Sequence, residues 1–349
     1  MAIPATVEEF TAGWFSEVLG KDVDRVDVLD AHSGTTGRAR LRLDGAGDLP
    51  QTVFVKLQPF LPEQRQFLRA TGLGVAEARF YAAVGDELPV RAPRVWHSSF
   101  DEEQAHFVMV LEDLVASGCR FPGPDDPEVL AVATSLVDEL ALLHAHYWGD
   151  ELDWLGTHAV SARSTKEQRK SIGGATAIVR SALEQFGADM PAAFRQLGEL
   201  YVARSREVAA LWSDGISTLI HGDDHIGNLF VDQGRAGFFD WAVASRFPGM
   251  RDVAYFLGNS LPAAVRRVEE GALLERYRAA LARRGIVLEP GLQHEQYRLF
   301  TVYTWISATT TAAMGSRWQP AAAARAAMER TTRAVIDLDV LGLLGERLG

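Results

Sequence analysis

Three polar side chains stand out between residues 219 and 241, because their types suit chemistry on a phosphate group. Asp223 follows an apolar run, Asn228 comes next, and Asp240 lies further along the chain. An amide and a carboxylate offer the hard oxygen ligands that Mg²⁺ takes together with phosphate oxygens and water. The second carboxylate, Asp223, is then free to address a substrate hydroxyl. The set matches phosphoryl transfer, with one Asp as base and an Asn and another Asp on the metal ion.

A β-hairpin is expected to bring two of these residues together. β-type runs over 229–231 and 236–239 are separated by residues 232–235, Asp-Gln-Gly-Arg, whose central Gln-Gly pair predicts a two-residue turn. In that register the residues before and after the hairpin arrive at the same end of it. We therefore expect Asn228 and Asp240 to meet beside the catalytic loop.

The same stretch carries a family resemblance. Residues 221–228 read His-Gly-Asp-Asp-His-Ile-Gly-Asn and residues 239–241 read Phe-Asp-Trp. They resemble the H-G-D-x-H-x-x-N and I-D-W/F motifs of the aminoglycoside phosphotransferase and choline kinase superfamily, small-molecule relatives of the protein kinases. The resemblance implies ATP and Mg²⁺ as cofactors, Asp223 as the catalytic base, and Asn228 and Asp240 as Mg²⁺ ligands.

The resemblance also implies a fold. It is the α+β, bilobal protein-kinase-like fold, with an antiparallel sheet plus helix in the N-lobe and a mainly helical C-lobe that carries the catalytic β-hairpin. On this basis we expect an N-lobe over 1–115 and a C-lobe over 116–349, with the catalytic loop at 219–241.

Two other interpretations of the loop stay open at this point. His and Asp near a turn often only bond to the backbone, and we expect this of His221, Asp224 and His225. Alternatively, His221, Asp223, His225 and Asp240 could form the site of a metal-dependent hydrolase that needs no ATP.

Lys56 lies in an apolar run that predicts a strand. Period-two alternation over 53–57 places Lys56 and Phe54 on one face and the aliphatic residues on the other. A Lys on a covered face needs a charged partner. Glu77, in a predicted helix, and Glu63 are the two candidates. By resemblance, Lys56 would hold nucleotide phosphates and Glu77 would orient it.

A small turn precedes the strand that contains Leu41, and it comprises Gly34, Thr35, Thr36 and Gly37. A Gly/Thr turn can bring backbone N–H groups and hydroxyls against phosphates without Cβ clashes. By resemblance it is the nucleotide-covering loop of the N-lobe. A plain hairpin turn is the alternative interpretation.

The apolar run 107–111 predicts a further strand, and by resemblance it is the last strand before the interlobe hinge. Hinges of this kind offer a backbone C=O and N–H to adenine. The corresponding residues here are Glu112 and Leu114.

The C-lobe reads as mainly helical, with stretches near 262–284, 290–314 and 320–341 and an insertion over 150–212 whose function the sequence does not disclose. In relatives the last helices line the acceptor pocket. Aromatic residues among them favour an apolar or aromatic acceptor, although a buried core would use the same residues. These aromatic residues are Tyr297, Phe300, Tyr303, Trp305 and Trp318. The Leu-His-Ala-His-Tyr-Trp run over 143–148 resembles the ecdysteroid-kinase-like branch.

Composition narrows the cellular setting. The 349-residue chain has a net charge of -11, which argues against a nucleic-acid-binding surface, and its single cysteine excludes an intrachain disulfide. No signal peptide and no membrane span are expected, so we predict a cytoplasmic protein whose oligomeric state the sequence leaves open.

The sequence thus predicts a small-molecule kinase that transfers the γ-phosphoryl group of Mg·ATP to a hydroxyl of an acceptor not yet identified. Two alternatives share the fold. One is an aminoglycoside O-phosphotransferase that confers antibiotic resistance, and the other is a non-catalytic nucleotide-binding pseudokinase.

Overall fold

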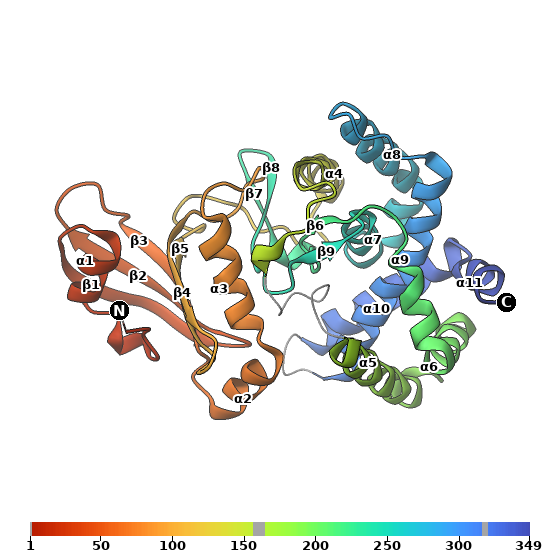
Figure 1. The fold of residues 1–349 in the computed structure, drawn as a ribbon, viewed down its shortest axis with the longest axis horizontal. Helices are drawn as coiled ribbons and strands as arrows, with labels where there is room; N and C mark the ends of the chain where they lie inside the picture. Colours follow the sequence, from red (N-terminus) through yellow and green to blue (C-terminus); the bar gives the residue numbers. More distant parts are fainter. Residues whose placement is uncertain (1, 156–164, 316–319) are drawn as a thin grey trace.

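An antiparallel sheet with flanking helices forms the N-terminal part of the computed structural model, which describes residues 2–155, 165–315 and 320–349 (Figure 1). The sheet has the strand order β1-β2-β3-β5-β4, and every neighbouring pair is antiparallel. Its strands are β1 (Val23–Ser33), β2 (Gly37–Gly45), β3 (Thr52–Leu57), β4 (Val95–Asp101) and β5 (His106–Glu112). The helices of this part are α1 (Ala12–Leu19), α2 (Pro62–Thr71) and α3 (Leu73–Val84).

The two faces of this sheet are covered differently. Alternate residues of β2 and β3, such as Leu41 and Val55, are fully buried and pack in one cluster with Phe15 of α1. On the other face, α3 packs against β4 and β5, and Phe80 of α3 joins a cluster that continues into the C-terminal part. Strand alternation therefore separates a purely structural face from the face that looks towards the rest of the chain.

Helices dominate the C-terminal part (Figure 1). They are α4 (Val129–His146), α5 (Thr165–Phe186), α6 (Ala192–Leu211), α7 (Met250–Asn259), α8 (Ala263–Ala282), α9 (Pro290–Ala313), α10 (Ala321–Asp337) and α11 (Val340–Leu348). α9 packs against both α7 and α10, and α4 packs against α8. The predicted bilobal α+β class, with a sheet-and-helix N-lobe and a helical C-lobe, is confirmed.

Two small two-stranded sheets lie within this helical part. β6 (Thr218–Ile220) pairs with β9 (Ser245–Phe247), and β7 (Leu229–Asp232) pairs with β8 (Arg235–Phe238). β7 and β8 pair in the predicted register, with Gln233 and Gly234 both at positive φ, as a tight hairpin turn requires.

α4 is the one helix in the described ranges that is long and apolar enough to cross a membrane. Leu136, Leu140 and Leu143 on this helix are fully buried inside the C-terminal part. A core helix of a folded protein has the same length and composition, so the finding is weak evidence for a membrane span.

The two parts share an apolar contact. The rings of Phe80 on α3 and Trp241 after β8 stack with their centroids 4.5 Å apart and nearly parallel. Polar contacts add to it, because Arg91 bonds to Glu112 at the end of β5 and to Asp232 at the hairpin turn. These contacts hold the N-terminal part and the hairpin region together.

Candidate active site

A buried carboxylate fixes the backbone of the loop that follows β6. Asp252 in the first turn of α7 accepts hydrogen bonds from the backbone N–H groups of His221, at 2.7 Å, and Gly222, at 2.9 Å. Gly222 has φ near +83°, and a Cβ there would lie 2.6 Å from the Val243 carbonyl oxygen. This arrangement fixes the backbone that leads into Asp223.

His221 organises the same loop. Its Nε2 lies 3.0 Å from the carbonyl oxygen of Phe239, and its Nδ1 accepts from the Asp223 N–H. Burial lowers the pKa of His221, so the ring is neutral at neutral pH. His225 Nδ1 likewise accepts from the Gly227 N–H. Both histidines thus bond to the backbone around Asp223.

Asp223 is oriented by two donors. The Tyr255 hydroxyl donates to Oδ1 at 2.6 Å, and the Asn228 amide donates to Oδ2 at 3.2 Å and to the Asp223 carbonyl at 2.8 Å. Tyr255 also hydrogen-bonds to Ser307 of α9 at 3.0 Å. With its side chain 39% exposed, Asp223 still reaches solvent, as a base that meets a bound hydroxyl must.

The hairpin places Asn228 and Asp240 as its register predicts. The Phe239 N–H donates to the Asn228 carbonyl at 3.1 Å, which joins the residue before β7 to the segment after β8. Asp240 has φ near +67°, an uncommon conformation for a residue other than glycine. Since the Asn228 amide nitrogen bonds to Asp223, its amide oxygen is the atom left for a metal ion.

Lys56 connects the sheet to the hairpin. Its Nζ lies 2.5 Å from Glu77 Oε2 on α3 and 3.2 Å from Asp240 Oδ1. Glu77 is therefore the partner of Lys56, whereas Glu63 on α2 is exposed. This contact joins three elements that lie far apart in the sequence at one point.

The two carboxyl groups that contact Lys56 have pKa values shifted in opposite directions. Burial raises the pKa of Glu77 to about 7, even though the neighbouring Lys56 favours its ionised form. Burial also works against ionisation of Asp240, but the charges of Lys56 and Arg38 outweigh it and lower the pKa of that carboxyl. Asp240 therefore remains a carboxylate, the form that a metal ligand needs.

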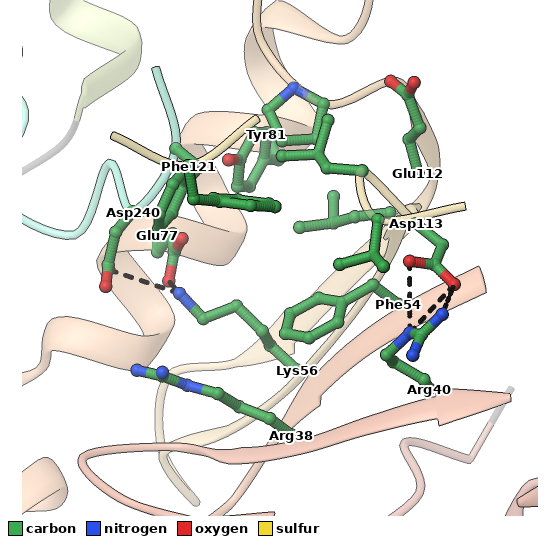
Figure 2. A pocket seen from close by; sticks show the side chains of 15 residues that line it. Arg38, Arg40, Phe54, Lys56, Glu77, Tyr81, Glu112, Asp113, Phe121 and Asp240 are labelled. Atoms are coloured by element: carbon green, nitrogen blue, oxygen red, sulfur yellow. Dashed lines mark hydrogen bonds and ion pairs between the residues drawn. The ribbon is translucent and has the colours of Figure 1, made fainter. Parts of the chain in front are cut away.

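A cleft runs between the sheet and the hairpin, and Figure 2 shows how its lining is divided. Lys56, Glu77 and Asp240 gather at one end, together with Arg38. Phe54 and Phe121 lie in the middle, and aliphatic residues such as Leu111 complete an apolar wall. A narrow apolar space that ends in charged groups suits a flat ring carrying a charged tail.

The predicted hinge residues line this cleft, but their groups are used unequally. The Glu112 N–H donates to the Arg94 carbonyl, and the Glu112 side chain bonds to Arg91. The Leu114 carbonyl accepts from Cys119, whereas the Leu114 N–H has no partner among the described residues. That N–H is a hinge group left for a ligand.

The predicted nucleotide loop lies at the tip of β1 and β2, and its four residues, Gly34, Thr35, Thr36 and Gly37, are not among those that line the cleft. Glycine at position 37 is required by packing, because a Cβ would lie 2.3 Å from the Gln58 carbonyl oxygen. The space around Gly34 is open. A role for these residues at the phosphates stays a prediction.

Three cleft residues carry contacts that the sequence did not disclose. Arg40 forms a two-pronged ion pair with Asp113, which follows the last strand of the sheet. Arg38 extends into the polar end of the cleft (Figure 2). Alternation of arginine with apolar residues along β2 was the available signal, since it places these side chains on the face shared with Lys56.

Most of the aromatic residues expected at the acceptor belong to the core. Tyr297, Phe300 and Trp305 of α9 are buried among the C-terminal helices, while Tyr303 is half-buried and its ring lies 6.0 Å from that of Tyr255. Trp318 lies outside the described residues. The three buried rings belong to the face of α9 that packs against other helices, so they do not support an apolar acceptor.

The alternative of a metal-dependent hydrolase has no geometric support. Within residues 2–155, 165–315 and 320–349, no group of three or more His, Cys, Asp or Glu side chains could hold a metal ion. His221 in particular uses both ring nitrogens on the backbone.

Comparison with protein families finds one match. The model of the phosphotransferase enzyme family matches residues 27–287, which span most of the sheet, the cleft and the catalytic loop. No curated protein matches the chain.

Solved structures share the fold at low sequence identity. A choline kinase from Cryptosporidium parvum has a TM-score of 0.57 at 11% identity, with 93% of this chain and 94% of that chain covered. An ethanolamine kinase from Plasmodium vivax has a TM-score of 0.56 at 12% identity, with 90% and 83% covered. At such identity the likeness concerns the fold alone.

Proposed function

The chain belongs to the phosphotransferase enzyme family, and we propose that it transfers the γ-phosphoryl group of Mg·ATP to a hydroxyl of a small molecule. One observation carries this proposal: Lys56 contacts both Glu77 and Asp240 at the charged end of an otherwise apolar cleft. The geometry supports a nucleotide with its base against the apolar wall and its phosphates at Lys56.

Each residue then has a distinct task. Asn228 and Asp240 would hold Mg²⁺, which when bound neutralises charge on the phosphates. Lys56 steadies the phosphate chain, and Glu77 orients Lys56. The apolar wall and the Leu114 N–H receive the base. We extend this assignment to Glu112 and to the Gly34–Gly37 turn as nucleotide contacts.

The chemical step falls to Asp223. The acceptor hydroxyl gives its proton to the Asp223 carboxylate while its oxygen bonds to the γ-phosphorus. The bond from that phosphorus to the β–γ bridging oxygen breaks, and the electron pair leaves with ADP. Catalysis then comes mainly from holding the two substrates in line and from neutralising charge.

We also propose the wider setting. The lobes divide near residue 115, with the nucleotide on the sheet side and the acceptor on the helical side. Membership of the ecdysteroid-kinase-like branch is a proposal that rests on residues 143–148 alone. A cytoplasmic location rests on composition. The acceptor is a small molecule whose chemistry the α9 aromatic residues do not define.

Nucleotide binding can be tested without knowing the acceptor. Thermal unfolding would be followed with Mg²⁺ alone, ATP alone and both, for wild type and Asp240→Ala. A ligand that binds only the folded state, present at about 100 times its Kd, adds about 2.7 kcal/mol of stability. We expect a clear shift only with both ligands in wild type, and none in the variant.

A matched control is Asp138→Ala, which removes an acid of α4 that is paired with Arg276 outside the cleft. It should respond to Mg·ATP as wild type does. No shift in wild type at saturating nucleotide would overturn the proposal, and an undiminished shift in Asp240→Ala would overturn the metal assignment.

A further inference from the structure

Three arginines follow one another on the same face of β2, and each has a different environment. Arg42 is 51% exposed and lies 3.6 Å from Asp27 on β1, away from the cleft. Arg40 lines the cleft but is held by the Asp113 carboxylate. Arg38 lines the cleft at the opposite, phosphate end.

Arg38 lacks an acidic partner. Its Nε donates to the Thr36 hydroxyl at a long 3.4 Å, and no carboxylate of the described residues lies within ion-pair distance of its guanidinium. Arg40, the other arginine of the cleft lining, is by contrast paired with Asp113. The end of the Arg38 side chain is therefore free to bind a ligand.

The position of Arg38 is fixed by the sheet. Arg38 pairs directly with Lys56 across β2 and β3, so the two cations leave neighbouring strands on the same face. Figure 2 shows the Arg38 side chain reaching alongside Lys56, towards the side of the cleft where Asp240 lies. Its charge also helps to lower the pKa of Asp240.

At the phosphate end of the cleft, Lys56 alone does not supply enough positive charge for a phosphate chain. Lys56 already contacts two carboxylates, so its charge is largely balanced before any nucleotide arrives. A guanidinium presents parallel N–H groups whose spacing matches two oxygens of a phosphate. Arg38 is the cation of the cleft that a phosphate chain would meet unpaired.

We propose that Arg38 is a second cationic contact for the phosphate chain of the nucleotide and makes affinity depend on the number of phosphates. This inference rests on the proposed function, because it takes Mg·ATP as the ligand of the cleft. It assigns Arg38 a specificity role that Lys56, held between two acids, cannot supply alone.

The test is calorimetric titration of the full chain with ATP, ADP and AMP at saturating Mg²⁺. Arg38→Gln should weaken ATP binding by about 10- to 100-fold, ADP binding by less, and AMP binding by under about twofold. Arg38→Lys keeps the charge but not the fork, and it should fall between wild type and Arg38→Gln.

Arg42→Gln is the matched control, since it removes the same charge from the same face of β2 outside the cleft, and it should bind all three nucleotides as wild type does. Circular dichroism would verify that each variant is folded, and Arg38→Lys keeps the test decisive if Arg38→Gln does not fold. The Arg38 role is overturned if Arg38→Gln, or in its absence Arg38→Lys, binds ATP as tightly as wild type. An equal loss for all three nucleotides would also overturn it. Failure of wild type to bind Mg·ATP would instead overturn the proposed function, and this inference with it.

Discussion

The nucleotide side and the acceptor side of the site differ in how far they are assembled before any ligand binds. On the nucleotide side, Lys56 and Glu77 are 6% and 1% exposed and already in contact. On the acceptor side, the Asp223 carboxylate is 39% exposed. A rigid sheet sets the first group, while a loop and two helices set the second. The groups proposed to bind the nucleotide are thus in place before it binds, whereas the site around Asp223 is completed only when an acceptor binds.

This difference predicts two separable classes of variant. Changes at Asp240 or Arg38 should weaken nucleotide binding, as argued above. Changes around Asp223 should lower turnover and leave nucleotide binding intact. This division would be contradicted if changes around Asp223 weakened nucleotide binding. It would also be contradicted if changes at Asp240 or Arg38 lowered turnover and left nucleotide binding intact.

The largest effect is expected for Asp223→Ala, which removes the base. Turnover should fall by about 10²- to 10⁴-fold. The Mg·ATP-induced shift in unfolding temperature should remain, because Asp223 lies outside the nucleotide contacts. The measurement is ADP release in the presence of an acceptor found by screening a library of small alcohols. Turnover equal to that of wild type would refute the role of Asp223.

A smaller effect is expected for Tyr255→Phe. The variant loses one hydrogen bond to a carboxylate, which is worth about 1.5 to 3 kcal/mol, so kcat should fall by about tenfold or more. The KM for ATP should stay near that of wild type. Ser307→Ala provides a milder change on the same chain of hydroxyls. A raised KM for ATP with unchanged kcat would show that Tyr255 supports nucleotide binding and does not act through Asp223, which would contradict this prediction.

A last effect, on stability and not on turnover, concerns Asp224, the neighbour of Asp223 in the opposite environment. Asp224 is fully buried, and neither carboxyl oxygen has a partner among the described residues. Burial raises its pKa well above the ordinary value, and the nearby Asp252 charge adds to the effect. The folded state therefore keeps a proton that the unfolded chain releases near pH 4.

The sign of the pH dependence follows from this shift. The stability that the protonated Asp224 contributes is present below about pH 4 and is lost as the pH rises towards its raised folded-state pKa. Asp224→Asn does not titrate, so the variant should gain stability relative to wild type between pH 4 and 8. Urea unfolding of both proteins at several pH values measures this, and parallel stability curves would contradict it.

The sequence predicted what short-range patterns control. Alternation over 53–57 correctly placed Phe54 and Lys56 on one face of the strand, which the structure shows to line the cleft, and the Gln233-Gly234 turn predicted the register of β7 and β8. Both predictions depend on residues only a few positions apart. The kinase-like fold followed from the motif at 221–228, which the family comparison supports.

Contacts between segments that lie far apart in the chain could not be predicted from the sequence. The hydroxyl of Tyr255 reaches an aspartate 32 positions earlier, and Arg40 meets Asp113 across 73 positions. The sequence showed aromatic residues in the stretch 290–314 but not which neighbours they would meet, so an aromatic acceptor and a buried core both stayed open. Packing between helices and strands decides such contacts, and a single sequence does not show which of these elements pack together.

The stack between Phe80 and Trp241 has a consequence for the protein during its synthesis. The sheet is complete once residue 112 has been made, and its α1 side already has a core. Trp154, whose ring lies 5.8 Å from that of Phe80, is made next, but the stacked ring of Trp241 is not made until residue 241. At 5–20 residues per second, the 129 residues from 112 to 241 leave the stacking face of Phe80 uncovered on the ribosome for roughly 6 to 26 s. During that interval the nascent chain exposes part of an apolar surface that the finished protein buries completely.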